Sequence, residues 1–147
     1  MAYLDTTVRR SLERAQLADT YERIDWAVQE GEDLNGASID VVRQKFQAWI
    51  LTDVDAEGWR YGGSRHHACI MVEQADLNHL LEYAASTEEE RKELIDPRVW
   101  LVSARDGGDD DDECEPCTRI DIRSLMPRAY NLLKRPGWLS IYGSTRP

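Results

Sequence analysis

The sequence predicts an α+β fold: an N-terminal helical hairpin packed on a small, mostly antiparallel sheet of three or four strands, with two or three further helices. Helical periodicity fills the first third of the chain, and short segments with strand-like alternation follow Gly58. Further helical segments separate those strands. The 147 residues fit one domain. In this domain, residues 1–57 are expected to form the hairpin and residues 58–147 the mixed part.

The first helix of the hairpin is expected over residues 5–30 and ends at a glycine. Its apolar side chains fall on two nearly opposite faces, which divide near residues 15–17. Either the helix breaks there, or its two halves pack on different neighbours, one of which could be a second molecule in an oligomer. The second helix is expected to begin at a cap on Ser38 or Asp40 and to end at about Thr52, because five apolar residues recur there on one face.

The second part of the chain alternates predicted strands and helices. Strands are expected over residues 65–72, 98–103, 118–123 and 138–142, and helices over residues 76–84, 86–95 and from Ser124 to the Pro136-Gly137 pair. In the first of these helices, Leu77, Leu80 and Leu81 are expected to be buried. An acidic loop, residues 105–117, connects the second and third strands.

The chain carries a net charge of −10, which favours some partners over others. Binding to bare nucleic acid needs a basic field, so no direct nucleic-acid binding is expected, whereas a basic protein surface would be attracted. Solubility alone is the other explanation for the surplus of acids. The apolar runs are much shorter than the about 20 residues of a membrane span. Since there is also no signal-peptide pattern, a cytoplasmic protein without a membrane partner is expected.

Two segments supply the candidate partner-binding residues, and the acidic helices are expected to contribute to the same contact. Trp59, Arg60 and Tyr61 lie in a glycine-flanked turn, and tryptophan and tyrosine dominate binding hot spots. In the acidic loop, the candidates are Asp109, Asp110, Asp111, Asp112 and Glu113. Two alternatives stay open: Trp59 could tuck under its own loop, and the acidic loop could fold back on the basic C-terminal third.

A zinc site is the alternative functional hypothesis. His67 and Cys69 are two residues apart, so on a strand both side chains point to one face. Cys114 and Cys117 form a CxxC pair, which can supply two zinc ligands from one turn. Together these residues would make a Cys3His ligand set, either structural or catalytic. No other cofactor is expected, and the odd number of cysteines argues against a disulfide framework.

These observations favour a non-enzymatic acidic protein that inhibits or neutralises a basic partner, most readily one that handles nucleic acid. Immunity proteins that neutralise toxins and phage-encoded inhibitors of host defence are of this type. An enzyme is the less favoured class. His66 and His67 could act as general bases, but no orienting carboxylate accompanies them. The sequence also contains no GxGxxG, P-loop or HExxH motif.

Overall fold

The computed structural model of the chain describes residues 2–24, 26–52, 64–105, 117–134, 137, 138, 140 and 141. The α-helices are α1 (Ala2–Arg14), α2 (Ala18–Tyr21), α3 (Ile39–Thr52), α4 (Gln74–Ala85), α5 (Glu88–Arg91) and α6 (Tyr130–Lys134). The strands are β1 (Ala68–Met71), β2 (Arg98–Ser103) and β3 (Cys117–Asp121). Short helical turns are η1 (Glu32–Leu34), η3 (Ser64–His66), η4 (Ile122–Ser124) and η5 (Leu125–Ala129). None of the described helices has the length and apolar character needed to cross a membrane.

The three strands form one antiparallel sheet with β2 in the middle. In its register, Leu101 of β2 lies between Ile70 of β1 and Thr118 of β3. β2 has the bounds that the sequence predicts, because Pro97 stops the preceding segment and the strand pattern starts directly after it. The predicted α+β class is therefore confirmed, with α1 packed on the sheet.

The sheet carries a hydrophobic core on each face. The larger core joins β2 and β3 to α1 and α6, and includes Leu4, Val99, Leu101, Ile120 and Leu133. The smaller core joins α3 to the sheet through Phe46, Ile50 and Ala104, with Trp49 and Cys69 packed beside them. Because neighbouring residues on a strand point to opposite faces, these two cores lie on opposite sides of the sheet.

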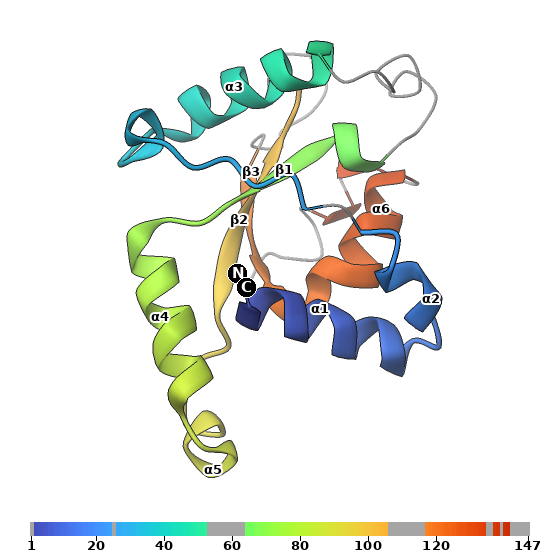
Figure 1. Cartoon of the computed structure of the whole chain (residues 1–147), viewed down its shortest axis with the longest axis vertical. Helices are drawn as coiled ribbons and strands as arrows, with labels where there is room; N and C mark the ends of the chain where they lie inside the picture. Colours follow the sequence, from blue (N-terminus) through green and yellow to red (C-terminus); the bar gives the residue numbers. More distant parts are fainter. Residues whose placement is uncertain are drawn as a thin grey trace.

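The two N-terminal helices do not form the expected hairpin with each other. α1 packs in the larger core and α3 in the smaller one, so the sheet lies between them (Figure 1). Each helix has one apolar face, and the sheet offers a broader apolar surface to that face than another narrow helical stripe would. The helical layers of the domain are therefore divided between both faces of the sheet.

The first helix breaks near residues 15–17, which is one of the two expected alternatives. Gln16 has a φ of 60°, in the left-handed region, and α2 lasts for one turn. The expected continuation to residue 30 is wrong, because the chain folds back along α1. The Tyr21 hydroxyl and the Trp26 indole N–H both donate to the Asp5 carboxylate, at 2.6 and 3.1 Å. These tertiary hydrogen bonds replace further helical turns.

Three of the predicted strands also differ in the structure, and the third of the four covers Cys117–Asp121 instead of residues 118–123 because Ile122 begins the turn η4. The first begins at Ala68 instead of residue 65, because the preceding residues form the turn η3. The expected last strand is wrong, since Trp138, Ser140 and Ile141 are helical. Ile141 is only 1% exposed and belongs to the larger core. A helical turn after Gly137 therefore buries this residue without adding a fourth strand.

Candidate protein-binding surface

One part of the molecule combines a large negative net charge with exposed apolar side chains. It comprises α4, α5 and their flanking turns, residues 73–96, and we call it the acidic arm. These 24 residues carry eight acids and two bases, a net charge of −6, and all of them are described. Figure 1 shows the arm extending past the end of the sheet, with α5 at its tip. The arm therefore concentrates more than half of the net charge of −10 in one projecting element.

The start of the arm is fixed to the sheet by an ion pair. Asp76, in the first turn of α4, is only 5% exposed, and both of its carboxylate oxygens accept hydrogen bonds from Arg119 of β3. Arg119 also lies 3.8 Å from the Glu73 carboxylate, and its guanidinium stacks 5.0 Å from the centre of the Trp100 ring. Asp76 and Glu73 additionally form the capping box that begins α4.

A second polar cluster fixes the middle of the arm. Tyr83 is 1% exposed, and its hydroxyl donates to Asp96 at 2.8 Å while it accepts from Arg123 of η4 at 2.5 Å. Arg123 and Asp96 form an ion pair at 2.7 Å. Burial raises the pKa of Tyr83, and the hydrogen bond to Asp96 raises it further, so the hydroxyl keeps its proton at neutral pH. The arm is thus tied to the body at two separate points.

The tip of the arm is shaped by two kinds of helix cap. Thr87 and Glu90 form the capping box of α5, which confirms the helix start that the sequence predicts near this point. The hydrogen bonds from the Thr87 backbone and side chain lower the pKa of Glu90. Arg91 turns back and donates to the carbonyl oxygens of Tyr83 and Ala84, both at 2.8 Å, which caps the end of α4.

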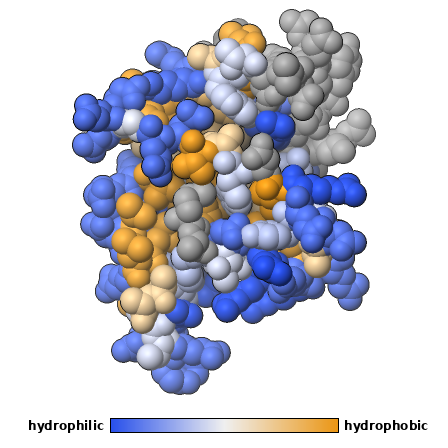
Figure 2. Space-filling model, in the orientation of Figure 1, coloured by the Kyte–Doolittle hydropathy of each residue, from blue (hydrophilic) through white to orange (hydrophobic). Residues whose placement is uncertain are grey.

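The outer side of α4 exposes two leucines that the sequence predicts to be buried. Leu77 is 38% exposed and Leu81 is 60% exposed, whereas Leu80 is 7% exposed as expected. The prediction is wrong for the first two because Asp76 takes the inward position, where Arg119 neutralises it. Figure 2 shows the result as a hydrophobic stripe along α4 with hydrophilic side chains beside it. We call Leu77 and Leu81 the leucine stripe.

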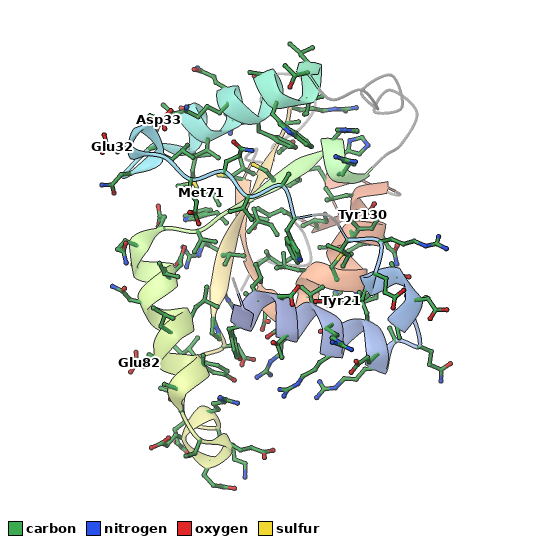
Figure 3. The ribbon with its side chains drawn as sticks, viewed as in Figure 1. Tyr21, Glu32, Asp33, Met71, Glu82 and Tyr130 are labelled. Atoms are coloured by element: carbon green, nitrogen blue, oxygen red, sulfur yellow. The ribbon has the colours of Figure 1, made fainter. Side chains whose placement is uncertain are left out.

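Three carboxylates of the arm lie outside these internal contacts. Glu82 follows Leu81 on α4, and Glu88 and Glu93 lie at the tip. None of the three forms an ion pair with another residue of the described chain. All three side chains are exposed, and Figure 3 shows Glu82 on the side of α4 that faces away from the sheet. These carboxylates are consequently available to a positively charged partner.

The predicted contact segments cannot be placed beside this arm. Trp59, Arg60 and Tyr61 lie outside the described residues, and so do Asp109, Asp110, Asp111, Asp112 and Glu113. Their role in partner binding stays a prediction.

The described members of the predicted zinc site do not form a ligand group. His67 lies in the turn before β1, and Val102 separates Cys69 from Cys117 in the register of the sheet. Within the described ranges, no three His, Cys, Asp or Glu side chains are arranged to hold a metal ion. Cys114 lies outside those ranges. The four-ligand hypothesis therefore stays a prediction, which elemental analysis of purified protein tests.

Burial shifts the pKa values of two of the predicted zinc ligands, Cys69 and His67. Burial in the smaller core raises the pKa of Cys69 to about 12, so its thiol is protonated at neutral pH. Burial and the nearby Arg105 and His66 lower the pKa of His67.

The histidine that was a second candidate base is packed against an aromatic ring. His66 is 2% exposed, its ring lies 5.9 Å from that of Trp49, and Arg65 lies over the same indole. This arrangement gives His66 a packing role in the layer beside α3.

The sequence contains one signal for the acidic arm, although the individual residues predicted to contact a partner lie outside this segment. Residues 73–96 hold eight of the 28 acids but only two of the 18 bases. Counting the charged residues over a segment of helical length reveals this surplus of acids. Counting over a longer segment that includes the neighbouring arginines hides it. The exposure of the leucine stripe has no such signal, because it depends on the contact with Arg119 in a distant strand.

Comparisons with protein-family models, curated proteins and solved structures found no match to the chain.

Proposed function

We propose that the chain is a non-enzymatic binding protein whose acidic arm holds a basic protein partner. The observation that carries this proposal is the leucine stripe, which lies exposed beside carboxylates without ion-pair partners in the described chain. Solubility explains exposed carboxylates. It does not explain two neighbouring leucines in water, and exposed apolar side chains rimmed by polar ones are typical of protein-binding surfaces.

The finer form of the proposal is that the chain inhibits a partner that handles nucleic acid. Such a partner carries a basic surface for phosphates. An acidic arm seated on that surface would compete with the nucleic acid and would be guided to it by long-range attraction. Immunity proteins and phage-encoded inhibitors of defence enzymes are proteins of this kind.

Affinity capture from a lysate of the native host, followed by mass spectrometry, tests the proposal. The immobilised chain should retain a basic protein at low salt. It should release that protein at about 1 M salt, where the Debye length falls to about 3 Å. A Glu82→Gln/Glu88→Gln variant should retain less of that protein. The matched control is Asp19→Asn/Glu22→Gln, which removes the same charge from α2 and its C-terminal cap, on the opposite side of the molecule in Figure 1.

The purified partner then allows the inhibition itself to be measured. Its nucleic-acid affinity should fall as the acidic chain is added, and the fall should be smaller with the arm variant than with the control variant. Retention that is independent of salt, or equal loss with both charge variants, would contradict the role of the arm. Retention without competition would keep the binding function and remove the inhibitory one.

A further inference from the structure

We infer that the leucine stripe docks an amphipathic, basic α-helix of the partner protein. This inference rests on the proposed function and adds the secondary structure and the residue pattern of the bound segment.

The geometry of α4 defines the shape of the docking surface. The helix has 12 residues, and Leu77 and Leu81 are one turn apart on its outer side. Ala84 follows seven residues after Leu77 and is partly exposed, which extends the apolar row to the end of the helix. Leu80 and Tyr83 point to the body instead. The surface is therefore a narrow apolar row about 10 Å long, because Leu77 and Ala84 are separated by seven residues at a rise of about 1.5 Å each.

A helix fits this row better than an extended segment does. The backbone N–H and C=O groups in the middle of α4 are bonded within the helix, so they cannot pair with an added strand, which needs an open sheet edge. Side chains spaced by four residues form a ridge, and such ridges pack into the grooves of another helix. The bound segment should therefore carry apolar residues with helical spacing.

The charges of the arm select a basic helix. Its two bases are already engaged, since Arg91 caps α4 and Lys92 pairs with Glu89 at 2.9 Å. Glu82 follows Leu81 on α4, and Glu88 begins α5 beyond the end of the row, and neither has an ion-pair partner in the described chain. Lysines and arginines that flank the apolar face of the docked helix would meet these carboxylates, whereas acidic residues there would be repelled.

The arm is also fixed before the partner arrives. Its contacts with Arg119 and Arg123 hold α4 against the sheet, so docking requires no ordering of this helix. Preorganisation of this kind reduces the entropy cost of binding.

A pair of labelled peptides tests the inference on the full chain. The first is an 18-residue peptide with leucines at helical spacing and lysines elsewhere, and the second has the same composition in an order without an apolar face. Fluorescence anisotropy should show that the chain binds the first peptide at least about tenfold more tightly than the second. Circular dichroism should show that the first peptide gains helix on binding.

Variants of exposed leucines provide the structural control. Leu77→Ser/Leu81→Ser should weaken binding of the helical peptide by about tenfold or more, as at other binding hot spots. Leu17→Ser should leave binding unchanged, since Leu17 is 40% exposed, close to the 38% of Leu77, and lies next to α2. All of these side chains are exposed, and urea unfolding confirms that the variants are folded.

Three outcomes would overturn the inference. Equal binding of both peptides would show that charge alone acts, which leaves the proposed function standing. If the leucine variant captures as much of the basic partner as the wild type does, the contact lies elsewhere on the chain. A dimer of the chain alone that the leucine variant converts to monomer would make a second copy the occupant. By contrast, failure of the host-lysate capture would count against the proposed function itself.

Discussion

Arg119 of β3 donates hydrogen bonds to both carboxylate oxygens of Asp76, which lies 43 residues earlier in the first turn of α4. The Asp76 side chain is 5% exposed and that of Arg119 is 35% exposed. The pair therefore lies at the edge of the interior, where the loss of one partner leaves the other charge poorly solvated.

Asp76→Ala should lower the free energy of unfolding by about 2 kcal/mol, measured by urea denaturation. This value is below that for a fully buried pair because water reaches the guanidinium. Glu13→Ala is the control, since Glu13 and Arg9 form an exposed pair at 3.2 Å. Its effect should stay within about 0.5 kcal/mol. Equal effects of the two substitutions would mean that Arg119 does not hold the arm.

Tyr83→Phe should lower the free energy of unfolding by about 1–2 kcal/mol, because it removes the hydroxyl between Asp96 and Arg123 and leaves both without that contact. Tyr130→Phe should be nearly neutral, since Tyr130 is 41% exposed. Thermal or urea unfolding of both variants provides the comparison. A neutral Tyr83→Phe would show that the ring alone, by its packing, secures the middle of the arm.

Asp121→Asn should raise the free energy of unfolding, relative to that of the wild type, more at pH 7 than near pH 3. Burial raises the pKa of Asp121, with the charge of Asp96 acting in the same direction, although the hydrogen bond from the Arg123 N–H opposes them. A carboxyl whose pKa is higher in the folded state binds its proton more tightly there, so the contribution of Asp121 to stability falls as pH rises above about 4. The asparagine oxygen can still accept from Arg123. Parallel pH dependence in both proteins would contradict this assignment.

Cys69 should react with iodoacetamide at pH 8 only after unfolding, as mapped by mass spectrometry. Burial raises its pKa to about 12, so the reactive thiolate is scarce in the folded protein. Labelling in 6 M guanidinium measures the intrinsic reactivity of the same thiol. Fast labelling of the native protein would instead indicate that the smaller core opens readily between α3 and the sheet.

Local patterns in the sequence were sufficient to predict several elements. α3 follows from its cap at Ser38 and from one continuous apolar face, and β2 follows from Pro97 and the alternation after it. The capping pattern that begins at Ser86 predicts α5, although the structure uses Thr87 as the cap and ends the helix at Arg91 instead of residue 95. Each of these elements is determined by residues close in the chain, which is why a sequence pattern reveals it.

Contacts between distant residues decided the other elements. The hydrogen bonds from Tyr21 and Trp26 to Asp5 end the first helix early, and the burial of Ile141 in the larger core favours a helical turn where alternation predicts a strand. The leucine stripe is exposed because Asp76 takes the inward position on α4, where it pairs with Arg119. Since no pattern within one segment contains these pairings, the candidate surface could be predicted by charge but not by shape.

The left-handed turn at Gln16 makes this position a place where the protein can gain stability without any change in its hydrophobic cores. Residues with a Cβ atom are disfavoured at a φ of 60°, by about 1 kcal/mol, and glycine avoids this penalty. Gln16→Gly should therefore raise the melting temperature, whereas Gln16→Ala, which keeps the Cβ atom, should not. The Gln16→Gly protein should therefore tolerate destabilising changes in the acidic arm better than the wild type does.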